Sequence, residues 1–412
     1  MGFLAFAVAN LRWLFAGFLL TFASSFGQTF FISLFGGEIR AEYGLSHGDF
    51  GTLYMAATLA SAATLLWVGK FADHSRLDLV SGLILGGLAV TCLMMALSPG
   101  IAVLAVALFG LRLFGQGMLD HVALTAMARW YNRERGRAIA IAALGHPVGE
   151  AIFPAIGVFL AAAIGWRQTW VVACIALALA APLSMVLFRQ SRVPKTPLPP
   201  RREGEAPAEE WTRARVLRDP LFWILLPGLL APAFIVTGVF FHQVHLVETK
   251  GWELAWFAAG YPFFAATSIT SGLATGWIID RWSARRALPA YLLPMAGGLL
   301  VLAWSPEPGL ALLFFVLAGL TQGGSSAVLG AVWAELYGSA HIGAIRSVAV
   351  AAAVLSTALA PGLMGWLIDL GVAIETQLVA MAVYAGAATI VFALLSGALH
   401  RRACSTGAEV PY

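Results

Sequence analysis

The segment LVSGLILGGLAVTCLMMAL, residues 79–97, contains nineteen residues and no charged side chain. A helix of this length covers roughly 28 Å at a rise of about 1.5 Å per residue, close to the thickness of the bilayer hydrocarbon core. Similar apolar stretches recur along the chain with short breaks between them. We therefore predict twelve membrane-spanning helices, at residues 13–34, 51–69, 79–97, 101–127, 138–163, 168–188, 221–246, 253–278, 287–304, 309–333, 344–368 and 376–398.

The composition excludes a soluble globular protein. Hydrophobic residues make up 60% of the 412 residues and charged residues 11%, whereas soluble domains contain about 45–50% and about 25%. The net charge is +4, but the basic residues lie in short segments between spans, so we expect no nucleic-acid partner. The three cysteines form no CxxC motif and indicate neither a disulfide framework nor a metal site. The chain has no GxxxxGK[ST] segment, and we expect no cofactor.

One long polar break divides the chain. The stretch from Arg189 to Asp219 contains VPKTPLPPRREGEAPAEE, and so much proline and charge cannot form a packed core. The predicted domains are an N-terminal six-helix bundle (1–188), a cytoplasmic linker (189–219) and a C-terminal six-helix bundle with a short cytoplasmic tail (220–412).

The two halves repeat each other. Five pairs of identical residues are separated by 206 or 207 positions. A nearly constant separation across several helices indicates internal duplication. The pairs are Gly69 with Gly276, Asp73 with Asp280, Gln116 with Gln322, Tyr131 with Tyr337 and Pro154 with Pro361.

The basic residues predict the orientation in the membrane. With the amino terminus inside, 21 of the 25 Lys and Arg residues lie on the cytoplasmic side and three lie outside, while Arg112 is within a span. Cytoplasmic loops of membrane proteins carry an excess of Lys and Arg. We therefore expect a multi-pass protein of the bacterial inner membrane with both termini in the cytoplasm.

Several segments resemble the major facilitator superfamily. GKFADHSR (Gly69 to Arg76) is similar to the loop signature after the second helix of that family, and GWIIDRWSARR (Gly276 to Arg286) to its copy in the second half. LRLFGQG (Leu111 to Gly117) is similar to the arginine-containing motif of the fourth helix. RWYNRERGRAIAIAALG (Arg129 to Gly145) resembles the corresponding segment of monocarboxylate and oxalate/formate transporters.

The resemblance implies an all-α membrane protein with twelve transmembrane helices in two pseudo-symmetric six-helix bundles. We also expect a monomer that works by alternating access around a site at the membrane midplane. The loop signatures imply a role in gating at the cytoplasmic side. The candidate gating residues are Gly69, Asp73, Arg76, Gly276, Asp280 and Arg281.

The class of substrate stays open. Monocarboxylate transporters carry an arginine in helix eight, but residues 253–278 contain no basic residue, and the lysine that oxalate exchangers carry in helix eleven is also missing. GHPVGE (145–150) partly resembles the antiporter signature of the fifth helix. The candidates are therefore a transporter of a small organic solute, such as a carboxylate, and a proton-coupled exporter of drug-like or hydrophobic compounds.

Two charged residues are expected near mid-depth of the membrane. Arg112 lies about eleven residues into span four and Glu150 about twelve residues into span five, which places each roughly 17–18 Å into its span. An isolated charge there costs at least about 2.5–3.5 kcal/mol. Two interpretations remain open: a relay, in which protonation of Glu150 frees Arg112 to bind an anion, or a permanent ion pair between two helices.

Other polar residues at buried depth are candidates for binding substrate or protons. His146 precedes Glu150 by four residues and shares its helix face. Gln28, Gln116 and Gln322 either bind substrate or join helices by hydrogen bonds. His242 lies three residues before His245 near the outer end of span seven, where it either lines the cavity or anchors the interface. No third metal ligand is evident there.

We expect a proton-linked secondary transporter with a small-molecule substrate and lipid as its surroundings. An intramembrane enzyme would need a cluster of nucleophile and base or a metal site. The nearest candidate is the HxxxE pair of His146 and Glu150, which lacks further partners in the sequence. We therefore predict no enzymatic activity.

Overall fold

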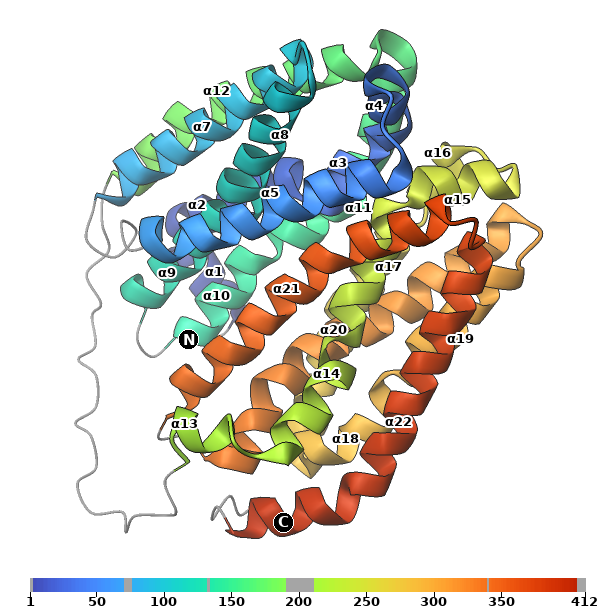
Figure 1. Cartoon of the computed structure of the whole chain (residues 1–412). Helices are drawn as coiled ribbons and strands as arrows, with labels where there is room; N and C mark the ends of the chain where they lie inside the picture. The colour runs from blue at the N-terminus through green and yellow to red at the C-terminus, as the bar shows by residue number, and fades with distance from the viewer. Residues whose placement is uncertain (1–2, 70–75, 132–133, 190–210, 339–340, 406–412) are drawn as a thin grey trace. The chain divides into compact units, whose positions relative to one another are not determined.

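The computed structural model describes residues 3–69, 76–131, 134–189, 211–338 and 341–405. These residues form helices and turns and no β-strand (Figure 1). Ten helices among them are long and apolar enough to cross a membrane. They are His47–Val68 (α5), Leu77–Leu97 (α7), Ile101–Trp130 (α8, η3 and α9), Arg135–Ile164 (α10 and α11), Trp166–Phe188 (α12), Pro220–Phe241 (α14), Ala284–Trp304 (α18 and α19), Pro308–Tyr337 (α20), Ile342–Asp369 (α21) and Ile374–Ala403 (within α22, Ile374–Ser405).

The first and eighth expected spans differ from continuous helices. The first is a pair of helical segments, Leu11–Gly27 and Thr29–Tyr43, that meet at an angle of 43°. The eighth, expected at residues 253–278, is divided into α16 (Leu254–Ala258) and α17 (Tyr261–Trp282). The new helix starts with a proline in its first turn, where a missing N–H costs nothing. Serine, threonine and glycine make the middle of α17 less apolar than the ten spans above.

The chain divides into two compact units. Unit 1 contains residues 1–201 and the segment 240–245, and unit 2 contains residues 202–239 and 246–412. Most of the expected linker, residues 190–210, lies outside the described residues. The expected tail beyond residue 405 does so as well.

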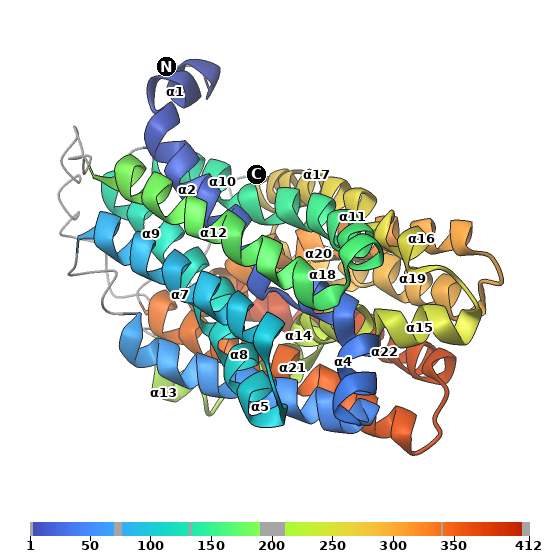
Figure 2. The ribbon, with the colours of Figure 1, turned by 90° about the horizontal axis from the view of Figure 1, so that it is seen from above.

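Unit 1 is built from closely packed helix pairs. α7 and α12 run side by side in Figures 1 and 2 and share the largest helix contact in the unit. Helix α2 (Leu11–Ala23) packs on α9 (Asp120–Trp130), α10 (Arg135–Ala143) and α11 (Gly145–Ile164). Glycine makes the approach to α11 possible, because a Cβ atom on Gly145 would overlap the carbonyl oxygen of Phe18. Small residues of this kind let helices pack in lipid, where no hydrophobic force drives them together.

Unit 2 packs α17 against α20, and α19 (Leu293–Trp304) against both α20 and α22. Proline inside α14 is accommodated by a partner from another helix. Pro232 lacks an N–H and so leaves the carbonyl of Gly228 without its helical donor. The hydroxyl of Tyr291, in α18 (Ala284–Tyr291), donates to that carbonyl at 2.9 Å. A backbone group released inside the membrane is thus satisfied by protein.

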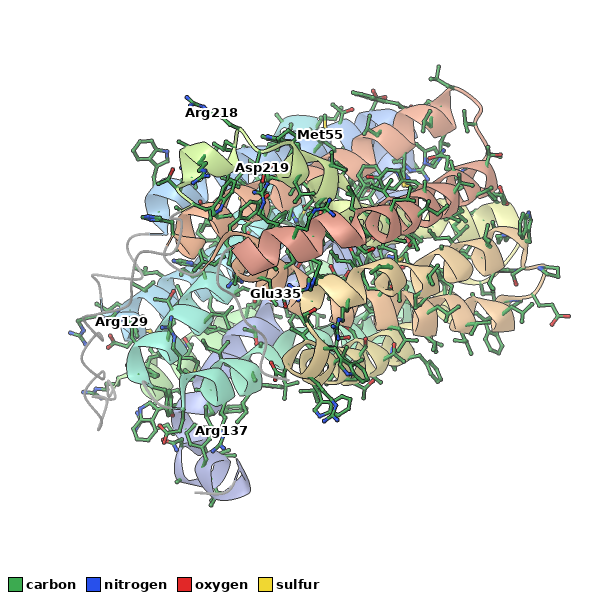
Figure 3. The ribbon with its side chains drawn as sticks, turned by 90° about the horizontal axis from the view of Figure 1, so that it is seen from below. Met55, Arg129, Arg137, Arg218, Asp219 and Glu335 are labelled. Atoms are coloured by element: carbon green, nitrogen blue, oxygen red, sulfur yellow. The ribbon has the colours of Figure 1, made fainter. Side chains whose placement is uncertain are left out.

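The end of unit 2 that is expected to be cytoplasmic is held by two carboxylates, both labelled in Figure 3. Asp219, just before α14, accepts from the guanidinium of Arg402 at 2.7 Å and from the hydroxyl of Tyr337 at 3.0 Å. Glu335 accepts from the backbone N–H groups of Ala284 and Arg285 at 2.6 and 3.2 Å, and so caps the start of α18. A carboxylate is stabilising there because of the free N–H groups and the helix dipole.

Candidate functional site

The candidate site in unit 1 begins at the break in the first span. Residues Ser24–Gly27 form a turn of 3₁₀ helix (η1), and Gln28 then adopts an extended conformation with φ −86° and ψ 154°. Helix α3 (Thr29–Ile32) starts directly after it. Broken helices of this kind leave backbone groups that must find partners within the protein, which is why they occur at binding sites in membrane proteins.

The fourth span is irregular at the same place. Its middle, Leu111–Leu119, is a π-helix (η3) between α8 (Ile101–Gly110) and α9. A Cβ atom on Gly27 would overlap the carbonyl oxygen of Leu111 and would lie 2.7 Å from the Cα atom of Gly115. Only glycine at position 27 allows this backbone contact. π-Helical segments are frequent at functional sites.

Arg112 lies in the π-helix and is 1% exposed. Its guanidinium donates to the carbonyl of Gly27 at 3.0 Å and to the hydroxyl of Thr58 at 3.2 Å. It also lies over the ring of Tyr54, with its carbon 5.1 Å from the ring centroid. The hydroxyl of Tyr54 shares a hydrogen bond of 2.8 Å with Thr29. The positive charge of Arg112 is therefore surrounded by neutral groups. They come from the break in span one and from α5.

Glu150 lies in α11 and is 8% exposed. Among the described residues, no ion pair joins Glu150 to Arg112, so the permanent ion pair that the sequence allowed is not formed in this structure. The reason is local: the guanidinium is directed to the carbonyl and hydroxyl acceptors of the broken span and α5. Pro154, four residues after Glu150 on the same helix, removes the N–H that would bond to the carbonyl of Glu150.

Two of the expected polar residues come together at the break. Gln28 Nε2 lies 3.4 Å from Nδ1 of His146, which joins the extended residue of span one to α11. The ring of Phe30 contacts the same imidazole edge-on. Gln116 lies in the π-helix, with its backbone nitrogen 3.0 Å from the position that a Cβ atom on Gly27 would take.

His242 is 3% exposed and belongs to the segment of unit 1 formed by residues 240–245. Its ring centroid lies 6.0 Å from that of His47, and the ring of His245 lies 4.3 Å from the same residue. Arg40 Nη1 lies 3.1 Å from Nε2 of His47. Sequence spacing did not point to His47, because it starts α5 nearly two hundred residues earlier. No group of three or more His, Cys, Asp or Glu residues in the described part of the chain could hold a metal ion.

The six candidate gating residues lie in different environments. The carbonyl of Gly69 is 3.2 Å from Nε2 of His121, and Arg76 forms a 2.7 Å ion pair with Asp78. Asp73 lies outside the described residues. Gly276, Asp280 and Arg281 are in α17; both charged residues are exposed, and a Cβ atom on Gly276 would meet nothing within 4 Å. Among the described residues, Gly276 therefore makes no close helix contact.

Gln322 lies in α20 of unit 2, and its Oε1 atom is buried without a hydrogen-bond partner among the described residues. In unit 1 the Oδ1 atom of Asp120 is in the same state, at the end of the π-helix. Sequence reasoning gave Asp120 no role. It also missed Gly27, Thr58 and Tyr54, although their small and polar side chains inside apolar spans are a usable signal.

The family is shown by comparison with known proteins. The family model described as Major Facilitator Superfamily matches residues 17–313. The chain therefore belongs to the Major Facilitator Superfamily, and it is a multi-pass membrane protein.

Several curated relatives are similar to this chain. It is 27% identical over 231 residues to an uncharacterized 38 kDa protein in the 23S RNA operon of Thermoproteus tenax, which covers 55% of this chain and 54% of that protein. It is 24% identical over 278 residues to the glycerol-3-phosphate transporter of Bacillus subtilis (strain 168), covering 62% of each. It is 25% identical over 280 residues to the membrane sensor protein UhpC of Salmonella typhimurium (strain LT2), covering 64% of this chain and 63% of that protein. The chain thus spans between half and two thirds of the length of these relatives.

Solved structures show the same fold at low identity. A bacterial homolog of the human lysosomal transporter Spinster, in an inward-facing and unoccupied conformation, matches with a TM-score of 0.67 and 17% identity over 97% of this chain and 98% of that one. The nucleoside transporter NupG matches with a TM-score of 0.68 and 12% identity over 94% and 99%. This likeness establishes the architecture of two six-helix bundles.

Proposed function

We propose that this chain is a secondary active transporter that moves a small organic anion across the bacterial inner membrane by alternating access, coupled to protons. Arg112 carries the proposal. Its guanidinium is 1% exposed, and its hydrogen bonds go to the neutral oxygens of Gly27 and Thr58. An unpaired charge in a membrane is expensive and is usually kept for function.

The geometry around Arg112 suits an anionic group. A guanidinium offers five N–H donors in a planar fork that matches carboxylate and phosphate. Two of the donors hold it in place at Gly27 and Thr58. The face of Tyr54 supports the cation by a cation–π interaction. One relative is a glycerol-3-phosphate transporter, which favours the same chemistry because carboxylates and phosphates both carry anionic oxygens.

Glu150 is the proposed proton carrier. It is buried on α11, which also carries His146 one turn earlier, and it has no ion pair to Arg112. A carboxyl group in such a place can exist neutral in one stage of transport and charged in another. The cytoplasmic location of both termini is supported by the distribution of Lys and Arg.

Uptake into proteoliposomes tests the proposal. The substrates are glycerol-3-phosphate, a series of small monocarboxylates and uncharged glycerol, each with and without an imposed pH gradient. We expect uptake of an anion. Arg112→Lys should lower it by about tenfold or more, because lysine lacks the planar fork. Gln116→Ala, the control in the same π-helix, should change uptake by less than about threefold.

Equal and small effects of the two substitutions would show that Arg112 has only a structural role. Efflux of a lipophilic dye, with no anion transported, would favour the exporter of hydrophobic compounds instead.

A further inference from the structure

Unit 2 contains a long apolar groove that the proposed transport site does not use. It has a volume of about 920 Å³ and is lined by side chains of α14, α21 and α22, together with Val372 in the turn between the last two. Figure 1 shows α14 between α21 and α22. None of the residues that line the groove is charged. The volume is at the upper end of the range for small-molecule sites, roughly 300–1,000 Å³.

Two glycines of α14 lie close to its neighbours α21 and α22. Gly238 lies against Met364 of α21, where a Cβ atom would overlap the sulfur. Gly228 lies against Phe392 of α22, where a Cβ atom would meet the ring at 2.5 Å. Residues between Trp223 and Ile235 of α14 line the groove.

The shape of the groove is elongated along the helices. On α21 the lining residues extend from Ala352 to Leu367, which is about 22 Å at 1.5 Å per residue, and Leu370 follows directly after the helix. This length exceeds one leaflet of the hydrocarbon core, which is roughly 15 Å thick. Leu363, Trp366 and Leu367 are each at least 40% exposed on this face. Exposed apolar groups on a membrane-spanning helix meet lipid chains rather than water.

One end of the groove has a different character. Thr376 and Gln377 lie in the first turn of α22, where the span begins. Gln377 is 4% exposed, and its Nε2 atom is oriented by the carbonyls of Val372 and Met364 at 3.1 and 3.4 Å. These two acceptors identify the nitrogen, so the remaining atom is the oxygen. Oε1 of Gln377 has no hydrogen-bond partner among the described residues.

We propose that this groove binds a phospholipid from the bilayer, with a hydrocarbon chain along α14 and α21 and a donor-bearing headgroup at the start of α22. The groove is long and apolar, and its lining residues carry no charge, so a hydrocarbon chain fits it. Water is a poor occupant because a buried water needs about two to four polar partners. The unsatisfied acceptor of Gln377 favours a headgroup with N–H or O–H groups, such as that of phosphatidylethanolamine, over phosphatidylcholine, which has none.

Native mass spectrometry of the purified full-length chain tests the proposal, with phosphatidylethanolamine and phosphatidylcholine of identical chains as probes. Wild type should retain one phosphatidylethanolamine after detergent exchange. Ala380→Trp and Ala352→Trp fill the groove from α22 and α21 and should both lose it. Val383→Trp is the matched control, because Val383 lies on α22, is 65% exposed and does not line the groove.

The headgroup is tested by Gln377→Met in the same experiment. Wild type should prefer phosphatidylethanolamine by about three- to tenfold, the worth of one hydrogen bond. The variant should bind both lipids equally. The proposal is overturned if neither lipid is retained, or if the filled variants retain as much as Val383→Trp. Equal wild-type retention of the two lipids overturns the headgroup assignment.

A further experiment distinguishes a bound lipid from a bound water-soluble molecule. The lipid-depleted chain is mixed with 1-anilinonaphthalene-8-sulfonate, and fluorescence is recorded before and after phosphatidylethanolamine is added. Displacement of the dye in wild type, but no change in Ala380→Trp, supports the lipid. Dye binding that the lipid does not displace assigns the groove to an apolar solute and overturns the proposal.

Discussion

The two units repeat one helical plan but differ in the chemistry of their interiors. The duplication that relates Gln116 to Gln322 also relates Arg112 to Ala318, and the one that relates Pro154 to Pro361 relates Glu150 to Thr357. The buried charged residues Arg112 and Glu150 therefore have small or neutral counterparts in unit 2. Asp120 follows the same rule, with Ser326 as its counterpart.

The backbone differs in the same way. Span four of unit 1 contains the π-helix Leu111–Leu119, while its counterpart α20 is an α-helix of 30 residues without interruption. Unit 1 has a buried cation, and unit 2 has an apolar groove of about 920 Å³. The comparison shows that, between the fourth span and its counterpart α20, the buried charge and the π-helix occur in unit 1 alone, whereas unit 2 has its helix break in the eighth span.

The largest effect that would sharpen this comparison is expected at Glu150. Glu150→Gln should abolish uptake driven by a pH gradient, by about 100-fold or more, because the amide cannot exchange a proton. Exchange of substrate between the two sides without a gradient should continue. Both are measured in proteoliposomes, with circular dichroism as the check on folding.

The control for Glu150 is a carboxylate of unit 2. Glu335→Gln weakens the cap on α18 and should lower stability while leaving proton coupling intact. Unchanged coupling in Glu150→Gln would place the proton elsewhere, with Asp120 the first residue to examine.

A smaller effect is expected from two glycines. Gly27→Ala places a Cβ atom in overlap with the carbonyl oxygen of Leu111, so the π-helix and the broken span must separate. We expect the apparent melting temperature to fall by roughly 5 °C or more. In Gly276→Ala the new Cβ atom meets nothing within 4 Å, so the apparent melting temperature should change by about 1 °C or rise through better helix propensity. Thermal unfolding in detergent measures both, and similar losses in the two variants would contradict the contrast.

The smallest effect concerns two ion pairs. Arg402 holds Asp219 with side chains that are 24% and 6% exposed, so Arg402→Gln should cost about 1–3 kcal/mol of stability by leaving a buried carboxylate with fewer partners. The Arg76 side chain is 71% exposed in its pair with Asp78, and Arg76→Gln should leave the melting temperature unchanged. Denaturant or thermal unfolding measures both variants. A larger loss of stability in Arg76→Gln than in Arg402→Gln would contradict the prediction.

Much of the fold could be predicted because a membrane span is recognised from the length and apolar composition of its own residues. Residues 79–97 were expected as a helix, and α7 runs from Leu77 to Leu97. The break at Gln28 and the π-helix could not be predicted, because both depend on a contact between spans one and four. Residue by residue, Gln28 and His146 were chosen for polarity and depth, and the structure brings them within 3.4 Å. His47, by contrast, meets His242 only through folding of a distant segment.

The amino-acid sequence alone determined that this chain is a bundle of membrane helices, and it predicted an internal duplication and two charged residues at mid-depth. Lipid offers no hydrogen bonds, so each apolar segment must form its backbone hydrogen bonds within itself as a helix. The length and the apolar composition of a segment are therefore enough to predict that it spans the membrane. The tertiary structure alone decided which atoms surround Arg112. A guanidinium takes whichever acceptors the neighbouring helices bring within about 3 Å, and here these are the carbonyl of Gly27 and the hydroxyl of Thr58 rather than the carboxylate of Glu150.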